Sequence, residues 1–341
     1  MFRAPTRSVP SRPSHCWLGL LPGLGLAALL AAAATAAQGL SGIAALSPMA
    51  LAMAAGIAIR NGIGLPEGAS PGLAFAMRPV LRAGIVLLGF RLTLGDLAAL
   101  GVPALGAVAA TLAATFLFTK AAGRALGVEP RLAELIAAGT SVCGASAILA
   151  VNAVTRARDE DVAYAIACVT VFGTAAMLLT PLLAGPLGFA GAEFGLWVGA
   201  TVHEVAQAVG AAFAGGEAAG QAGTVAKLAR VMMLAPLVLA LGALAARRGD
   251  RAGGARAPMP WFVLGFVAAA GVNSAVAIPP GLSAAVGQGA GFLLTLALAA
   301  MGLETRLGRL RAMGLRPLAL GAAAWVFILA LGGALVALVG A

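Results

Sequence analysis

The sequence predicts an all-α fold, a polytopic membrane helix bundle of about eleven transmembrane helices with interrupted helices and an inverted repeat. Composition is the first reason, because 61% of the 341 residues are hydrophobic and only 10% are charged, whereas about a quarter of the residues of a soluble domain are charged. The second reason is that uncharged runs of about twenty residues, enough to cross a hydrocarbon core of roughly 30 Å, fill most of the chain. Disordered, coiled-coil and disulfide-rich secreted classes are therefore excluded.

Eight uncharged runs and two runs that carry charge account for the eleven spans. One uncharged run is long enough for two spans, because Pro279 and Pro280 divide it at a tight turn. The spans that must accommodate charged or titratable residues are 80–100 and 194–216. The uncharged runs are residues 17–37, 43–59, 97–119, 135–155, 162–192, 231–246, 257–303 and 317–341.

The first run has a positively charged start and an alanine-rich end, so it is either a retained helix or a cleaved signal peptide. Its 21 uncharged residues exceed the 7 to 15 of a signal-peptide core, which favours a retained helix. Residues 1–16 are then a cytoplasmic tail, and residues 17–341 form a single integral membrane transporter domain. No connecting loop is long enough to form a soluble domain.

The basic residues indicate orientation, because cytoplasmic loops of membrane proteins collect Arg and Lys. The net charge of +10 therefore does not indicate a nucleic-acid partner. With the N-terminus in the cytoplasm, the second, fourth, eighth and tenth connections share its side and carry most of the basic residues. The C-terminus is then outside. Arg156 and Arg158 disagree, since they follow the fifth span on the outer side, beside three acidic residues.

A Gly-rich polar segment lies in the middle of the fifth predicted span. Irregular backbone at membrane depth persists only where it is packed in protein or lines water. Two half-helices interrupted here would aim N–H groups and positive dipole ends at one point, which suits an anion. Close packing of small residues against another helix is the alternative, and the segment alone leaves both open. The candidate substrate ligands are Gly139, Thr140, Ser141, Gly144, Ser146 and Asn152.

The seventh predicted span holds His203, Glu204 and Gln207. His203 and Gln207 share a helix face, whereas Glu204 projects about 100 degrees away. An ionisable side chain at membrane depth is costly unless paired or hydrated, so it indicates a functional site; a structural ion pair with an arginine is the alternative. Gln207 stands where the zinc-protease motif HExxH requires His, and the three cysteines lack metal-ligand spacing. We expect no metal site.

Arg91 in the third span and Glu304 near the end of the tenth lie in similar segments. At an offset of 213, residues 89–105 and 302–318 share seven identities in seventeen positions, where composition gives roughly two. The two spans run in opposite directions in the predicted topology, as an inverted repeat for alternating access requires. Shared membrane-exit signatures are the alternative. We assign Arg91 and Glu304 to the polar core with His203, Glu204 and Gln207.

Four segments resemble the YeiH-type family of bacterial inner-membrane proteins: GIVLLGFRL, AGTSVCGASAI, TVHEVAQ and RVMMLAP, at residues 84–92, 138–148, 201–207 and 230–236. The resemblance extends from about Gly42 to the C-terminus. It implies a carrier in the bacterial inner membrane, and the usual label of the family implies export of sulfate. Residues 139–181 are also similar to bile-acid/sodium symporter relatives, which implies a panel domain and a core domain with crossing interrupted helices.

Together these features predict a secondary transporter that exports sulfate or a related small organosulfur oxyanion. Glu204, with His203 beside it, would couple transport to protons, and coupling to sodium is equally open. The expected partners are the lipid bilayer, the anion and the coupling ion, with a homo-oligomer open and no cofactor. The alternatives are a scaffold or receptor without transport, and a membrane-embedded enzyme. We expect no enzyme, because no P-loop, GxSxG, HExxH or GxGxxG motif is present.

Overall fold

A computed structural model describes most of the chain. Within the described residues every regular element is a helix and none is a strand, which confirms the all-α class. Seven stretches are long and apolar enough to cross a membrane, and three shorter apolar helices accompany them, so the chain folds as a multi-pass membrane protein. The described residues are 17–41, 47–247, 260–276, 278–306, 308 and 314–340.

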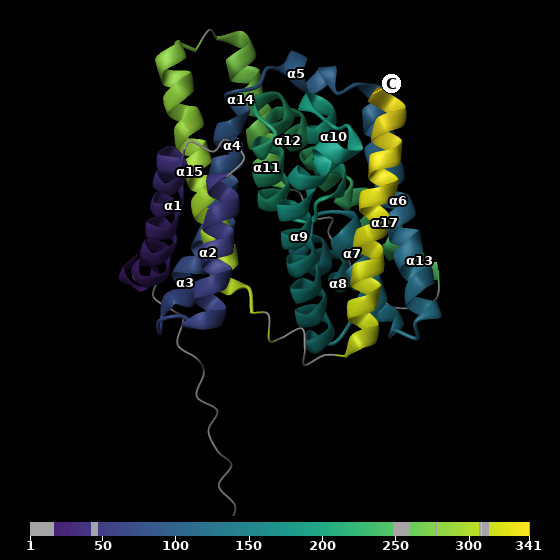
Figure 1. The fold of residues 1–341 in the computed structure, drawn as a ribbon. Coiled ribbons are helices and arrows are strands. Elements are labelled where there is room, and N and C mark those ends of the chain that lie inside the picture. Colours follow the sequence, from purple (N-terminus) through teal and green to yellow (C-terminus); the bar gives the residue numbers. More distant parts are fainter. Residues whose placement is uncertain are drawn as a thin grey trace, which may run out of the picture.

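Figure 1 shows two helix bundles side by side. The panel bundle consists of α1 (Leu21–Ser41), α2 (Pro48–Gly62), α3 (Ala69–Phe75), α4 (Leu81–Gly89), α14 (Trp261–Ala275) and α15 (Pro280–Glu304). The core bundle consists of α6 (Gly101–Ala125), α7 (Pro130–Ser141), α8 (Ala145–Thr155), α9 (Asp159–Leu187), α10 (Gly191–Thr201), α11 (Val205–Ala214), α12 (Glu217–Met232), α13 (Leu234–Arg247) and α17 (Leu315–Gly340). The short helix α5 (Leu94–Ala99) connects them, and two short turns precede α1 and α4, Trp17–Leu20 and Ala76–Val80.

The panel bundle packs through small residues. A Cβ atom added to Gly56 would lie 2.7 Å from the carbonyl oxygen of Ala299, so α2 and α15 are in backbone contact. Apposed small residues allow such close approach between membrane helices. The buried residues of α1, α3 and the adjoining part of α15 are mostly alanine and leucine, so this bundle is an apolar scaffold.

The helices that flank the two segments matched at an offset of 213 form antiparallel pairs. Helix α4 is antiparallel to α15, and α6 is antiparallel to α17, because residues near one end of each helix face residues near the other end of its partner. The facing pairs are Gly84 with Leu294 and Gly287 with Arg91 in the first case, and Gly123 with Leu320 and Gly332 with Thr111 in the second.

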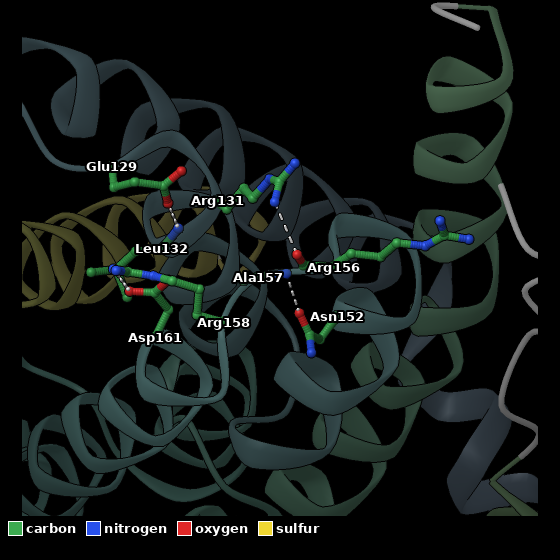
Figure 2. Close-up of polar contacts among 8 residues, drawn as sticks. All are labelled: Glu129, Arg131, Leu132, Asn152, Arg156, Ala157, Arg158 and Asp161. Carbon is green, nitrogen blue, oxygen red and sulfur yellow. Dashed lines mark hydrogen bonds and ion pairs between the residues drawn. The ribbon is translucent and has the colours of Figure 1, made fainter. Parts of the chain in front are cut away.

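Residues 135–155 do not cross the bundle, so this predicted span is wrong. Helices α7 and α8 fold back as a hairpin, in which Thr155 Oγ1 donates a hydrogen bond to Glu134 Oε1 at 2.7 Å. At the same end, the guanidinium of Arg131 donates to the carbonyl oxygen of Arg156 at 3.1 Å (Figure 2). Collinear helices would separate these residues by more than about 30 Å.

Residues 194–216 likewise form a hairpin rather than a span. A Cβ atom on Gly215 would overlap the ring of Phe194, so the end of α11 returns to the start of α10. This hairpin enters from the opposite end of the core bundle (Figure 1). The four half-helices have 10 to 12 residues each, and about twenty are needed to cross the hydrocarbon core. The length of an uncharged run does not distinguish a straight helix from a hairpin of the same length.

The first hairpin removes the disagreement in the predicted topology. Because α8 returns to the end where α7 began, Arg156 lines a cavity of about 370 Å³ together with Lys120, Arg124 and Arg131. We call this end of the molecule the basic end. Arg158 follows on the same side, where it pairs with Asp161 at 2.9 Å (Figure 2). The predicted cytoplasmic tail 1–16 and most of the basic connection 247–256 lie outside the described residues.

Two other predicted spans have different bounds. The third runs from Ala69 to Gly89 rather than over residues 80–100, so Arg91 lies beyond its end instead of within it. The eighth runs from Glu217 to Arg247 rather than over residues 231–246. This longer span takes in two basic residues that lie at the centre of the molecule.

Candidate functional site

The tips of the two hairpins meet near the middle of the core bundle. The backbone N–H of Ala145, the first residue of α8, donates to Glu204 Oε1 at 2.6 Å. Gly144 precedes it with a φ of 67°, in the left-handed region that favours glycine. A Cβ atom at this position would overlap the Glu204 carboxylate. The interruption predicted in the fifth span therefore lies in contact with the break between α10 and α11, and Gly144 makes room for the side chain from the other tip.

Lys227 of α12 holds both tips together. Its ammonium group donates to the carbonyl oxygens of Val142 at 2.9 Å, Val202 at 2.7 Å and His203 at 2.6 Å. The Lys227 side chain is fully buried. A buried ammonium is tolerated only when its three donors find acceptors, and here all three do.

Arg230, one helical turn further along α12, makes a second set of such bonds. Its guanidinium donates to the carbonyl oxygens of Ser141 at 2.6 Å and Val202 at 3.0 Å, and also to that of Thr140. These carbonyl groups lie at the C-terminal ends of α7 and α10, where a helix leaves acceptors unpaired and carries a partial negative charge. Both basic side chains of α12 thus neutralise two converging helix ends.

The second tip is fixed to α9 through Gln207. The amide oxygen of Gln207 accepts from the backbone N–H of Glu204 at 3.4 Å, and its amide nitrogen donates to Thr174 Oγ1 at 3.2 Å. His203 lies beside this contact and is fully buried. Neither of its ring nitrogens has a hydrogen-bond partner among the described residues. His203, Glu204 and Gln207 lie at the second tip, but His203 and Gln207 do not share a helix face as expected, because α10 ends at Thr201 and α11 begins at Val205.

The residues of the junction differ in their exposure. Ser146 is exposed and Glu204 is partly exposed, whereas Ser141, Cys143 and His203 are buried. The Ser146 hydroxyl donates to the carbonyl oxygen of Cys143 at 3.1 Å. A small molecule that approaches the junction would therefore meet the start of α8 and the Glu204 carboxylate first.

Three of the predicted site residues lie away from this junction. Asn152 caps the end of α8, where its side-chain oxygen accepts from the N–H of Ala157 at 2.8 Å (Figure 2). Glu304 is the last residue of α15 in the panel bundle. Arg91 lies at the end opposite the basic end, where it pairs with Glu217 of the core bundle at 3.3 Å.

Other predicted ligands are at the junction but contribute differently from expectation. Thr140 and Ser141 offer backbone carbonyl groups to Arg230, and the Ser141 hydroxyl donates to its own helix at Ala137, at 2.6 Å. Gly139 allows close packing, because a Cβ there would approach Val169 and Ile148 within 3 Å. The first N–H of α8, expected for an anion, is bonded to Glu204.

Sequence reasoning missed Lys227 and Arg230. The predicted eighth span begins at Val231, directly after a charged residue, so both cations lie just outside it. The available signal was that Arg230 opens the fourth segment resembling the YeiH-type family. In the structure both residues lie inside the long apolar stretch from Glu217 to Arg247.

A cleft of about 550 Å³ separates the bundles at the end opposite the basic end. Its wall includes the Arg91–Glu217 pair and Phe213 at the end of α11. Below it α11 contacts the panel bundle, since a Cβ on Gly210 would lie 3.0 Å from Leu298. Helix α11 therefore carries Glu204 before its first residue and the contact between bundles along its length. Among the described residues, no three His, Cys, Asp or Glu side chains gather closely enough to hold a metal ion.

Comparison with known proteins identifies the family. The model of the family described as "Conserved hypothetical protein 698" matches residues 22–321. The UPF0324 membrane protein TauZ of Paracoccus pantotrophus is 41% identical over 313 residues, 90% of this chain and 92% of the relative. The UPF0324 membrane protein PA5383 of Pseudomonas aeruginosa is 40% identical over 329 residues, 92% and 93% of the two chains. No solved structure matches the chain. The chain belongs to the UPF0324 family of membrane proteins, the YeiH-type family that its motifs resemble.

Proposed function

We propose that this protein is a secondary transporter of the bacterial inner membrane that carries sulfate or a related small organosulfur oxyanion by alternating access. The observation that carries this proposal is the meeting of two hairpin tips from opposite ends, with the Glu204 carboxylate bonded to the N–H of Ala145. Secondary transporters place their sites where discontinuous helices meet near the middle of the membrane. Irregular backbone at that depth is otherwise excluded by the cost of unpaired polar groups.

Nine crossings and two re-entrant hairpins make up the proposed topology. The crossings are α1, α2, α3 with α4, α6, α9, α12 with α13, α14, α15 and α17. The basic end is cytoplasmic under the positive-inside rule, which puts the N-terminus in the cytoplasm and the C-terminus outside. The rule supports this orientation more strongly than it supported eleven crossings, because Arg156 and Arg158 now agree with it.

An inverted repeat with a changed element order fits this arrangement. Helices α4 and α6 in the first half correspond to α15 and α17 in the second, and each pair is antiparallel. The first hairpin follows α6, whereas the second hairpin precedes α12 and lies before α15 in the chain. We infer that the second repeat is circularly permuted, which explains why the second hairpin does not lie 213 residues after the first. Opposed hairpins support alternating access.

The contact between the bundles suits a rocking motion. Helix α11 provides the main packing of the core bundle on the panel bundle, against α15 and α2. At the outer end, Arg91 and Glu217 join the bundles, with 33% and 44% of their side chains exposed. An ion pair exposed to this degree contributes only about 0–1 kcal/mol. It can therefore close the outer cleft and still open in every cycle.

Glu204 is the proposed link between anion and proton. The N–H of Ala145 begins α8 and is the type of donor that binds oxyanions at a helix start, but Glu204 accepts its bond. A substrate oxyanion would replace the carboxylate at this N–H. Protonation of Glu204 would weaken its hold on the N–H and favour that exchange. Ser146, exposed beside Ala145, would offer its hydroxyl to the same anion.

Transport in liposomes tests this proposal. Purified protein should move labelled sulfate or a sulfonate under an imposed pH gradient or membrane potential. Glu204→Gln keeps an acceptor for the Ala145 N–H but loses the proton site, so the effect of the pH gradient should fall at least tenfold. Glu193→Gln, a partly buried carboxylate in the first turn of α10 and away from the junction, is the matched control and should behave as the wild type.

Normal response of Glu204→Gln to every gradient would show that the coupling assignment is wrong. Absence of anion movement in the wild type under all gradients would instead favour a scaffold or receptor.

A further inference from the structure

The carbonyl groups of the hairpin tips form a cage around a cation. Val142 from the first tip, with Val202 and His203 from the second, place their oxygens 2.6 to 2.9 Å from the Lys227 ammonium. Thr140 and Ser141 extend the same row of acceptors toward Arg230. Residues 140–142 of the first tip and residues 202 and 203 of the second thus turn five carbonyl groups toward α12.

Such a cage is the usual place for a metal cation in a secondary transporter. Unwound backbone and the C-terminal ends of half-helices coordinate the coupling Na⁺, because carbonyl oxygens are its preferred ligands and the helix ends carry negative partial charge. Here the position is filled by the chain itself. Lys227 uses all three of its donors on these oxygens and is fully buried, which leaves no room for an added ion.

We propose that the Lys227 ammonium group replaces a sodium ion at the junction of the hairpins, so that the protein folds and works without sodium. This inference rests on the proposed transport function and deepens it, because it removes sodium from the two coupling ions that the sequence left open. A covalently attached charge cannot leave with the substrate. Lys227 therefore holds the tips together throughout the cycle, and the coupling ion binds elsewhere.

Removal of the lysine should restore a sodium site. Thermal unfolding is measured on purified wild type and on Lys227→Ala in sodium, potassium or choline chloride at equal ionic strength. The wild type should have the same melting temperature in all three salts. Lys227→Ala should be less stable, and sodium alone should raise its melting temperature by at least about 2 °C, since a ligand that binds only the folded state stabilises it.

Two variants serve as controls. Lys227→Arg keeps a cation in the cage and should show no sodium effect. Lys120→Ala removes the other lysine of the chain, which pairs with Glu134 at the basic end, and should also show none. These measurements need no substrate and no transport. If liposomes show no anion flux at all, the proposed function fails while the sodium result still stands.

Stabilisation of the wild type by sodium would overturn the proposal, and so would a Lys227→Ala variant that unfolds at the same temperature in every salt. If Lys227→Ala folds only in sodium, the proposal is supported, because a bound sodium ion then replaces the ammonium group that folding requires. If Lys227→Ala folds in no salt, anion flux through the wild type tests the proposal instead. Exchange of sodium for choline on both sides of the liposome should leave this flux unchanged. Loss of the flux in choline would overturn the proposal.

Discussion

The two hairpins differ in what their tips contribute. The residue before α8 is Gly144, with a φ of 67°, and the residue at the same place before α11 is Glu204, with a φ of −90°. The first tip contributes backbone groups to the contact between the tips, and the second also contributes the Glu204 carboxylate. The absence of a side chain at Gly144 is what allows Glu204 to reach the N–H of Ala145. Neither tip forms the junction alone.

The hairpins nevertheless share one support. Lys227 and Arg230 of α12 each bond to carbonyl groups from both tips. The comparison teaches that charge neutralisation is common to the two hairpins, whereas the reactive group belongs to one of them. Substitutions in α12 should therefore affect folding, and substitutions at Gly144 or Glu204 should affect the contact between the tips.

The entry of the hairpins from opposite ends predicts an all-or-none labelling pattern. Single cysteines replace Arg124, Arg158 or Leu187 in a background without the native cysteines, and a membrane-impermeant thiol reagent is added to either side. In the proposed topology Arg124→Cys and Arg158→Cys should react from the cytoplasm, because the first hairpin starts and ends at the basic end. Leu187→Cys should react only from outside. Reaction of Arg158→Cys from outside would show that residues 135–155 cross the membrane and do not form a hairpin.

Gly144→Ala should have a large effect on both stability and coupling. The new methyl group would occupy the position of the Glu204 carboxylate, and alanine is strained at this φ. Strain and overpacking together cost roughly 2–5 kcal/mol. Gly188→Ala, at the end of α9, is the matched control, because Gly188 has a φ of 80° and open space around it. Equal losses of melting temperature in the two variants would mean that the contact with Glu204 is unimportant.

Asn152→Ala should have the smallest effect. It removes one hydrogen bond, from the N–H of Ala157, and such a bond contributes about 1 kcal/mol. The variant should keep the wild-type affinity for the transported anion, since Asn152 lies at the basic end and the junction lies near the tips. An anion affinity lowered tenfold or more in flux measurements would return Asn152 to the binding site.

Much of the fold follows from the sequence because the bilayer imposes length and polarity on helices. The all-α class and the interruption around Gly139 to Ser146 could each be derived from local patterns. The hairpins could not, because a half-helix that turns back has the same composition as one that continues. What distinguishes them is a contact such as Thr155 with Glu134, which joins residues 21 positions apart.

The junction was harder to predict because its polar atoms belong largely to the backbone. Thr140 and Ser141 are predicted as ligands of the anion, yet they present carbonyl oxygens to Arg230. Sequence patterns describe side chains and give no direct sign of which carbonyl groups converge. Lys227 and Arg230 were missed for the related reason that a charge was treated as the end of a span.

The distance along the chain between the tips and α12 has a consequence for biosynthesis. Lys227 is 85 residues beyond Val142, and at ribosomal rates of about 5–20 residues per second it emerges roughly 4–17 s later. Until then, the newly made first hairpin has unpaired carbonyl groups that the hydrocarbon interior would penalise. The hairpin must therefore wait in an aqueous or protein-lined setting, such as the insertion machinery, until α12 is made.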